Sequence, residues 1–278
     1  MKRVLVRIYQ YFRKMKRLCR WGLTVPRQRR KILINRSMNQ IEDGKVMVLI
    51  PHSDDEWIGT SQLICSSREV LLCNMNMDGA DSPELHYKRY LEMERNAKKF
   101  SKKLIQIDDI EQLTNTIKQY EPQYVLAPFF LDWHQEHREV LHTLCKAIEN
   151  LSDEKEKLKV GMYQVSVPIP SDAVTHSFKM SFLTWFKKWK LFLSAYPSQK
   201  EIAYQRFALQ EVINGKYSNA WAGEIYSIWN ASEWCKVYND LDFDETNIKQ
   251  IKSKLNDIAE IREYVSALWA ITVQGELK

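Results

Sequence analysis

The chain has 278 residues and a formal net charge of +6, and its basic residues are concentrated at one end. The first 40 residues contain 13 lysines and arginines and no acid, which leaves 28 basic and 35 acidic residues for the remainder, a net charge of −7. A protein that coats nucleic acid carries its positive field over the folded body. The distribution excludes that class, and we expect no nucleic-acid partner.

The composition is that of a globular protein with reduced thiols. Hydrophobic residues make up 45% of the chain and charged residues 27%, and a body of this size can bury a core of its own. The best apolar runs, at 46–50 and 124–131, are shorter than the ~18 residues that a membrane-spanning helix needs, and no signal peptide is visible. The five cysteines are odd in number and include no C-x-x-C pair, so we expect a cytoplasmic protein.

The first segment is predicted to form an amphipathic helix. Its apolar residues recur at three- and four-residue steps and share one face, outside which the basic residues lie: Met1, Val4, Leu5, Ile8, Tyr11, Phe12, Met15, Leu18 and Cys19. Such a helix, with residues 1–40, can lie on an anionic membrane surface, or it can pack against the acidic body. A nucleic-acid tail is the weaker remaining alternative. Pro26 and the polar stretch 35–44 mark the expected boundary, which predicts a basic arm at 1–44 and a folded domain at 45–278.

The body is predicted to be an α/β domain. Apolar runs predict strands at 46–50, 69–74, 104–107, 124–128 and 159–167, and helical segments lie between them at 57–67, 84–101, 109–120 and 137–150. Strands that alternate with helices of this length form a mostly parallel sheet with helices on both faces. Beyond residue 181 the pattern is mostly helical, which predicts a helical C-terminal part.

Two loops rich in imidazoles and carboxylates follow two of these strands. The segment Pro51-His52-Ser53-Asp54-Asp55-Glu56 comes after the first strand, and Asp132-Trp133-His134-Gln135-Glu136-His137 follows the strand at 124–128. Ligands collect beyond the carboxyl ends of the strands of an open parallel sheet, so we expect the two loops to meet there. Two histidines and one aspartate make a three-ligand metal site with an open position, beside which a further carboxylate can act as a general base.

Each loop has a less specific interpretation when it is taken alone. Acids after a strand often only stabilise the N-terminus of a helix, and a His-x-x-His pair is often part of a solvated loop. Their joint position at the ends of two strands of one sheet favours a metal site. The other histidines are interpreted as ordinary surface or core residues: His86, His142 and His176.

The two loops resemble the signatures of a known family. The first is similar to the P/A-H-P-D-D-E motif of the PIG-L/LmbE-like zinc-dependent N-acetylglucosaminyl deacetylases, and His134-Gln135-Glu136-His137-Arg138 is similar to that family's H-x-D-H-R motif. Weaker similarities follow in the same order over about residues 46–226. They lie at Asn76-Met77-Asp78-Gly79, at Arg89-Tyr90-Leu91-Glu92 with Asn96-Ala97, at Lys190 with Tyr196-Pro197-Ser198-Gln199, and at Ala222-Gly223-Glu224-Ile225-Tyr226.

The resemblance implies a Rossmann-like fold that holds one Zn²⁺, with another divalent metal such as Fe²⁺ as the alternative. The implied metal ligands are His52, Asp55 and His137. Asp54 would be the general base, and His134 would stabilise the oxyanion or protonate the leaving amine; either residue could supply that proton. Arg89 would contact the substrate, and its other interpretation is a solvated charge on a helix.

The implied activity is removal of the N-acetyl group from an amino sugar of the N-acetylglucosamine type, in a glycolipid or polysaccharide precursor, by attack of a zinc-bound water. Hydrolysis of another amide or of a sugar–thiol conjugate is one alternative, and a non-catalytic sugar- or membrane-binding relative is another. A nucleotide-binding Rossmann enzyme is the weakest, because no G-x-G-x-x-G follows the first strand. We expect a cytoplasmic protein, and the basic arm adds the alternative that it binds peripherally at the inner face of the membrane.

Three departures from the family's signatures leave the proposed ligands and base intact. Ser53 replaces a proline, Glu136 replaces an aspartate, and Gly59 is followed by Thr60 and Ser61 in place of a second glycine. We therefore expect activity and leave the substrate open.

A stretch of aromatic residues at helical spacing bears on the substrate: Phe182, Trp185, Phe186, Trp189 and Phe192. It is either the buried face of a core helix, a second interfacial surface suited to a lipid-linked glycan, or a platform on which sugar rings stack.

Overall fold

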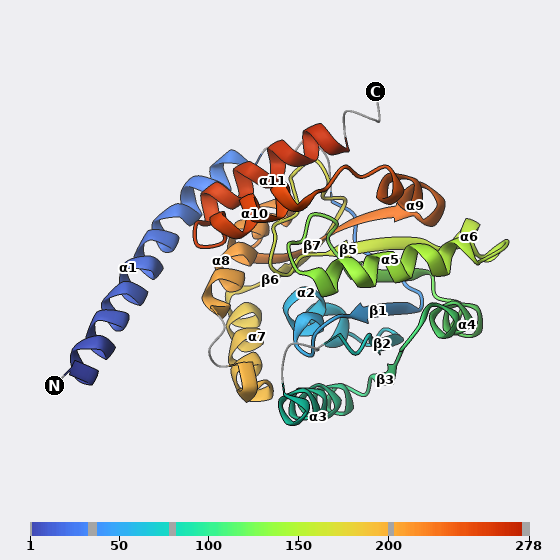
Figure 1. Cartoon of the computed structure of the whole chain (residues 1–278), viewed down its shortest axis with the longest axis horizontal. Helices are drawn as coiled ribbons and strands as arrows, with labels where there is room; N and C mark the ends of the chain where they lie inside the picture. Colours follow the sequence, from blue (N-terminus) through green and yellow to red (C-terminus); the bar gives the residue numbers. More distant parts are fainter. Residues whose placement is uncertain (1, 33–37, 78–81, 200–202, 274–278) are drawn as a thin grey trace.

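A computed structural model of the chain describes residues 2–32, 38–77, 82–199 and 203–273 (Figure 1). The strands are β1 (Val46–Ile50), β2 (Val70–Asn74), β3 (Lys103–Gln106), β4 (Tyr124–Pro128), β5 (Lys159–Tyr163), β6 (His176–Met180) and β7 (Ala222–Asn230). The α-helices are α1 (Lys2–Lys31), α2 (Asp55–Ile64), α3 (Pro83–Lys99), α4 (Ile110–Tyr120), α5 (Gln135–Glu149), α6 (Glu154–Lys157), α7 (Phe182–Ala195), α8 (Tyr204–Asn214), α9 (Ala231–Asn239), α10 (Glu245–Lys254) and α11 (Ile258–Thr272). Two 3₁₀-helices are η1 (Pro197–Gln199) and η2 (Gly215–Ser218).

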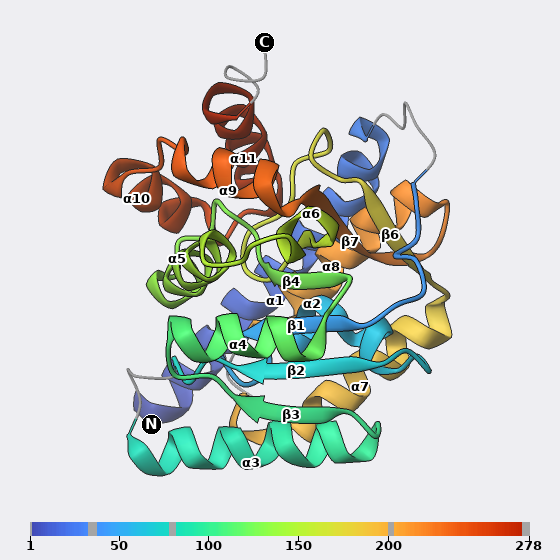
Figure 2. The same cartoon turned by 90° about the vertical axis from the view of Figure 1, so that its right-hand side faces the viewer.

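The strands form one seven-stranded sheet in the order β3-β2-β1-β4-β5-β7-β6 (Figure 2). The strands from β3 to β5 are parallel to their neighbours, whereas β7 is antiparallel to both β5 and β6. The predicted mostly parallel α/β sheet is confirmed. Because β1 pairs with β2 on one side and with β4 on the other, the chain reverses its winding direction between β1 and β4, where ligands bind in such sheets.

Helices cover both faces of the sheet, as expected. All five residues of β1 are buried, and they alternate between two hydrophobic cores. Met47 and Leu49 belong to the core that α4, α5, α9 and α11 close, and Val48 belongs to the core beneath α2, α3 and α7. A strand that is covered on both faces must be apolar at every position, which is the pattern that predicted β1.

The C-terminal part is mostly helical, as predicted, and it also contains the strand β7, which was not predicted. The nine-residue strand β7 lies in the region beyond residue 181. Its apolar pattern is interrupted by Glu224 and Ser227, which are both buried. Glu224 accepts hydrogen bonds from Ser61 Oγ at 2.5 Å and from Lys188 Nζ at 2.7 Å. A strand with a buried carboxylate does not show the apolar run by which strands are recognised in a sequence. The fifth predicted strand also ends early, since β5 stops at Tyr163.

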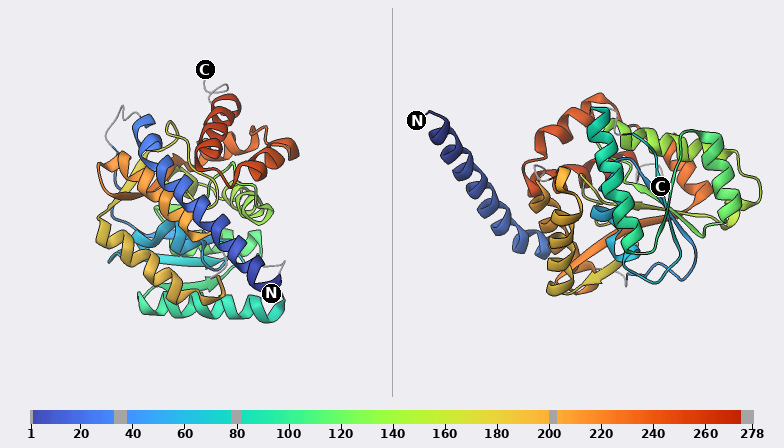
Figure 3. Two further views of the ribbon diagram at one scale, coloured as in Figure 1. Left: turned by 90° about the vertical axis from the view of Figure 1, so that its left-hand side faces the viewer. Right: turned by 90° about the horizontal axis from the view of Figure 1, so that it is seen from below.

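The basic segment forms the long helix α1, which continues through Pro26 to Lys31. Pro26 therefore lies inside the helix, and the predicted division between residues 1–44 and 45–278 stays a prediction. Trp21 and Val25 are buried and belong to the core that α11 helps to close, and Ile32, just beyond the helix, is buried with them. The alternative in which this segment packs on the body is confirmed for the second half of α1. Figure 3 shows that the first half extends away from the body.

Basic side chains of α1 also form hydrogen bonds or ion pairs with the body. Arg29 donates to the carbonyl oxygens of Ala220 and Trp221, at 3.0 Å each. Lys31 Nζ lies 2.5 Å from Glu263 of α11. These contacts fix the second half of α1 against the start of β7 and against α11. No helix within the described ranges combines the length and the apolarity that crossing a membrane requires.

The predicted aromatic helix is α7, and it is divided between core and surface. Trp189 and Phe192 are buried in the core beneath α2 and α3. Phe182 and Phe186 are about half exposed, at 48% and 53%. The interpretation of α7 as a core helix is thus confirmed for one face, and the other face is open.

Candidate metal centre

A tight turn leads from β1 into α2. The backbone N–H groups of Asp54 and Asp55 both donate to the carbonyl oxygen of His52, at 2.8 and 3.1 Å. Asp55 is the first residue of α2, and Asp54 precedes it in an extended conformation. The turn therefore places three side chains with metal-binding or acid–base chemistry at the N-terminus of a helix, where the helix dipole favours carboxylates.

The second loop supplies its imidazoles from the start of α5. His134 precedes the helix, and His137 lies in its first turn. The loop is held by Asp132, which is 1% exposed and accepts a hydrogen bond from the backbone N–H of His134 at 3.0 Å. Ser166 Oγ lies 2.8 Å from both carboxylate oxygens of Asp132. These contacts fix the loop at the edge of the sheet where β1 ends.

The three predicted ligands converge on one point. His52 Nδ1 lies 3.2 Å from Asp55 Oδ2 and 3.2 Å from His137 Nε2, and His137 Nε2 lies 3.1 Å from Asp55 Oδ2. The donor atoms of a tetrahedral zinc site with bonds of 2.0–2.1 Å are ~3.3 Å apart. The set of two nitrogens and one oxygen therefore fits a single divalent ion.

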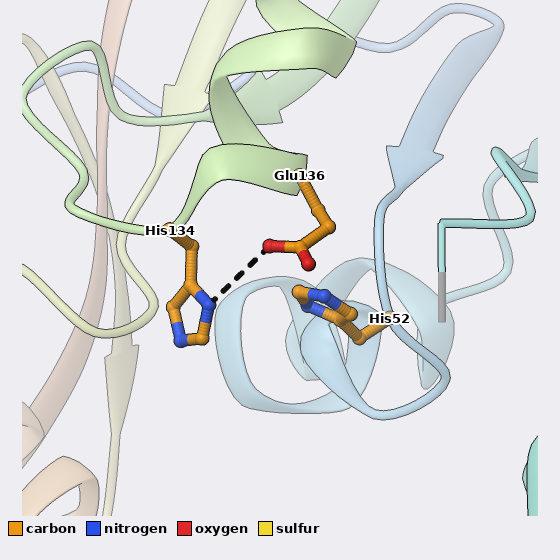
Figure 4. Close-up of side chains that lie close together, drawn as sticks. All are labelled: His52, His134 and Glu136. Carbon is orange, nitrogen blue, oxygen red and sulfur yellow. Dashed lines mark ion pairs between the residues drawn. The ribbon is translucent and has the colours of Figure 1, made fainter. Parts of the chain in front are cut away.

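A second candidate group shares His52 with the first. It combines His52 with His134 and Glu136, whose side chains are all partly exposed (Figure 4). Glu136 Oε2 lies 3.8 Å from His134 Nδ1, farther apart than the donor atoms of the first group. The group of His52, Asp55 and His137 is more compact and is held by buried partners, so it is the better candidate for a metal centre, and His134 lies beside it.

Asp132 contacts the far nitrogen of one ligand. Asp132 Oδ2 lies 3.0 Å from His137 Nδ1, while His137 Nε2 points to Asp55. A carboxylate behind a metal-binding histidine fixes the orientation of the ring and makes the nitrogen at the metal more basic. Asp132 belongs to the second loop, but its role was not predicted from the sequence. An aspartate five residues before a ligand is not a recognisable signal without the contact with His137.

The electrostatics of the centre favour a cation. Burial alone would lower the pKa of His137, but the carboxylates of Asp132 and Asp55 raise it to about 10. Burial would raise the pKa of Asp55, and the imidazoles of His137 and His52 hold it well below its usual range instead. Two buried carboxylates that bracket one imidazole stabilise positive charge between them, which a bound divalent ion also supplies.

The remaining predicted site residues lie around a pocket of about 350 Å³ next to the three ligands. Asp54 and His134 line the pocket beside the ligands, and Arg89 of α3 lines it as well. Burial lowers the pKa of His134. Two polar residues that line the pocket, Gln199 and Arg206, were among those without a predicted role, although Gln199 stands within the Tyr196–Gln199 similarity.

Residues of the weaker similarities brace the ligand turn from behind. Tyr196 Oη donates to Glu56 of α2 and accepts from Asn96 Nδ2 of α3 at 3.0 Å. Ser198 Oγ donates to Glu92 of α3 at 2.5 Å. These contacts join α2, α3 and η1. The segments with the weaker family similarities therefore support the turn that carries the candidate ligands. Asp78-Gly79 lies outside the described residues.

The departures from the signatures have local partners. Ser61, in place of a glycine, donates to Glu224 at 2.5 Å, and Thr60 Oγ1 donates to the carbonyl oxygen of Glu56 at 2.7 Å. Ser53 is buried in the turn. The longer side chain of Glu136 reaches His134 rather than a metal ligand.

Comparison with known proteins identifies the fold. No protein-family model matches the sequence, and no curated protein matches it. The solved structure of N,N′-diacetylchitobiose deacetylase from Pyrococcus horikoshii is similar over 77% of this chain and 94% of its own, with a TM-score of 0.58 and 19% sequence identity. The chain has the fold of the PIG-L/LmbE-type deacetylases. The fold that the two motifs implied is thereby confirmed.

Two other solved structures share this fold with the chain. A conserved protein from Thermus thermophilus is similar over 65% of this chain and 92% of its own, with a TM-score of 0.50 and 17% identity. The zinc-inhibited form of a teicoplanin deacetylase is similar over 66% of this chain and 97% of its own, with a TM-score of 0.50 and 10% identity. At these low sequence identities, the structural similarity shows only that the chain shares the PIG-L/LmbE-type fold.

Proposed function

We propose that the chain is a metal-dependent deacetylase that removes the N-acetyl group from an amino sugar of the N-acetylglucosamine type. The observation that carries the proposal is the convergence of His52, Asp55 and His137 at 3.1–3.2 Å beside a pocket lined by Asp54 and His134. It is supported by the shared fold, since two of the similar structures are deacetylases by name. The metal is proposed to be Zn²⁺, with Fe²⁺ as the alternative.

The pocket residues divide the chemistry of amide hydrolysis among them. A bound divalent ion supplies polarisation of the amide carbonyl and a lowered pKa for water at the site. Asp54 accepts the proton of the attacking water, because it is the pocket carboxylate that is not assigned as a ligand in the turn. His134 faces the developing oxyanion, and the leaving nitrogen receives its proton from Asp54 or His134. Arg89 contacts the sugar from α3.

The test of the proposed function is acetate release from a panel of N-acetyl amino sugars and other N-acyl amides. We expect release from the N-acetylglucosamine derivatives, and a loss of about 10²–10⁴-fold in Asp54→Asn with bound metal retained. Asp108 is exposed and does not line the pocket, so Asp108→Asn is the control and should be unchanged. Full activity in Asp54→Asn would rule out the assigned base. Release from the other amides alone would rule out the amino sugar.

We further propose that the first half of α1 and the exposed face of α7 contact an anionic membrane. Both helices lie on the same side of the molecule in Figure 3. Phe182, Phe186 and Trp221 are about half exposed, with Phe182 in ring contact with each of the other two, at centroid distances of 6.2 and 5.2 Å. Eight lysines and arginines lie within the first 20 residues of the chain. Exposed aromatics beside cations are typical of surfaces that lie in the interface of anionic bilayers.

Co-sedimentation with liposomes tests the membrane contact. Deletion of residues 2–14 removes only helix that extends away from the body. It leaves Trp21, Val25 and Ile32 in the core. We expect the full chain to sediment with anionic liposomes and not with zwitterionic ones, and the deletion to end sedimentation without lowering the unfolding midpoint. Equal sedimentation of both proteins would contradict the contact.

A further inference from the structure

A buried arginine lines the pocket beside the metal centre. Arg206, in the first turn of α8, is 9% exposed and lines the pocket with Arg89, Gln199 and Phe207. Its Nη1 donates to the carbonyl oxygen of Leu255 at 2.8 Å, and its Cζ lies 4.9 Å from the ring centroid of Phe207. These contacts hold the guanidinium in place without neutralising its charge.

Within the described ranges of the chain, no carboxylate lies at ion-pair distance from Arg206. Burial lowers the pKa of Arg206 to about 10, and the acid that acts against this shift is Asp132. Asp132 is already held by Ser166 and His137. A guanidinium with this pKa is charged at neutral pH, and a buried charge is costly unless an opposite charge meets it.

The acids of the pocket have other partners. Asp55 belongs to the metal centre, Glu136 lies at ion-pair distance from His134, and Asp54 belongs to the turn that carries the metal ligands. A guanidinium has five N–H donors in a planar fork that matches a phosphate or a carboxylate. Nη1 of Arg206 donates to the carbonyl oxygen of Leu255, and Arg206 lines a pocket of about 350 Å³ that can hold a ligand.

We propose that Arg206 forms an anion subsite, so that the substrate is an N-acetyl amino sugar bearing a phosphate or carboxylate substituent. This inference rests on the proposed function, because it names the substrate class of the same pocket. The subsite binds the anionic substituent, while the metal centre and Asp54 act on the acetamide. Neutral amino sugars lack the partner of Arg206 and bind more weakly.

A purely structural role is the competing explanation, because Arg206 also joins α8 to the end of α10 through Leu255. Arg262 of α11 offers a matched control. It is 8% exposed, and its Nη1 donates to Gln210 Oε1 of α8 at 2.7 Å, but it is not among the residues that line this pocket. Loss of Arg262 therefore removes a buried guanidinium contact with the same helix and leaves the subsite intact.

The experiment measures binding of deacetylated ligands, so that its result does not depend on turnover. Glucosamine 1-phosphate, muramic acid and glucosamine are titrated calorimetrically into the full-length, metal-loaded protein and into Arg206→Gln, Arg206→Lys and Arg262→Met. Acetate release from the N-acetylated form of each ligand is measured in parallel and tests the proposed function separately. The phosphate and carboxylate ligands distinguish the two kinds of anion.

We expect one or both anionic ligands to bind the native chain at least about 10-fold more tightly than glucosamine. Arg206→Gln should weaken their binding by about 10–100-fold, the effect of a hydrogen bond to a charged group, and leave glucosamine within about 2-fold. Arg206→Lys should retain part of the preference for anionic ligands over glucosamine, and Arg262→Met should retain all of this preference. Equal affinity of the native chain for all three ligands would overturn the subsite, as would an equal loss for all three in Arg206→Gln.

Discussion

Asp132 Oδ2 lies 3.0 Å from Nδ1 of His137, on the side of the ring opposite to Asp55. His137 is thus held between two buried carboxylates, one at the metal centre and one behind it. Asp132 is fixed in turn by Ser166 and by the backbone of His134. The relationship makes the orientation of His137, a proposed metal ligand, depend on a residue that does not line the pocket.

Replacement of Asp132 should therefore weaken metal binding. We expect Asp132→Ala to raise the dissociation constant of the metal by about 10–100-fold, because the ring of His137 loses the partner that fixes its orientation. Ser166→Ala removes only a hydrogen bond to Asp132 and should have a smaller effect in the same direction. Competition with a chelating dye measures both. An unchanged dissociation constant in Asp132→Ala would show that the contact does not support the site.

The packed half of α1 should contribute strongly to stability. Trp21 is 2% exposed, and its Nε1 donates to the carbonyl oxygen of Asn256 at 2.9 Å. We expect Trp21→Ala to lower the free energy of unfolding by about 3–5 kcal/mol, because it leaves a cavity between α1 and the body. Leu23, two residues away and 80% exposed, is the control, and Leu23→Ala should stay within about 0.5 kcal/mol. Equal effects in urea unfolding would mean that α1 does not pack as described.

A buried ion cluster behind the site should be sensitive to loss of its cation. Lys188 contacts Glu211, and its Nζ lies 2.7 Å from Glu224 Oε1. All three side chains are nearly inaccessible to solvent. We expect Lys188→Met to cost about 3–5 kcal/mol of unfolding free energy, because two buried carboxylates lose their shared cation. The neighbouring exposed Lys187 is the control, and a cost in Lys188→Met no larger than in Lys187→Met would contradict the cluster.

The same cluster should make stability depend on pH. Burial raises the pKa of Glu211 to about 7, against the opposing effect of Lys188. The folded chain then binds this proton more tightly than the unfolded chain, whose glutamate has a pKa near 4.3. The resulting stabilisation is fully present below about pH 4 and is lost as the pH rises through about 7. Urea unfolding between pH 5 and pH 8 should show this decline, and Glu211→Gln should make it shallower; an identical slope in both proteins would exclude Glu211 as a source.

The fold could be predicted where local pattern and topology suffice. The bounds of β1 and β4 agree with the predicted strands, because a strand buried on both faces shows an uninterrupted apolar run. The meeting of the two loops followed from the rule that ligands gather at the carboxyl ends of parallel strands, which needs only the order of the elements. The choice of His52, Asp55 and His137 within these loops followed from the resemblance to the family's motifs.

What could not be predicted depends on partners distant in the sequence. Glu224 is tolerated inside β7 because it meets Lys188, 36 residues earlier, and Ser61, 163 residues earlier. The role proposed for Arg206 could not be predicted, because it depends on two structural facts. Arg206 lines the pocket, and no acid of the described residues lies at ion-pair distance from it. The packing of α1 was left open because its amphipathic stripe fits a membrane as well as a protein surface.

The most direct test of the central claim is metal content measured together with acetate release on the same preparation. The native chain should hold about one divalent ion per molecule, lose acetate release from N,N′-diacetylchitobiose or an anionic N-acetyl amino sugar when the ion is chelated, and recover release when the ion is restored. His137→Ala should hold substantially less metal and release no acetate above background. A native chain without stoichiometric metal, or acetate release that survives complete removal of the metal, would contradict the account.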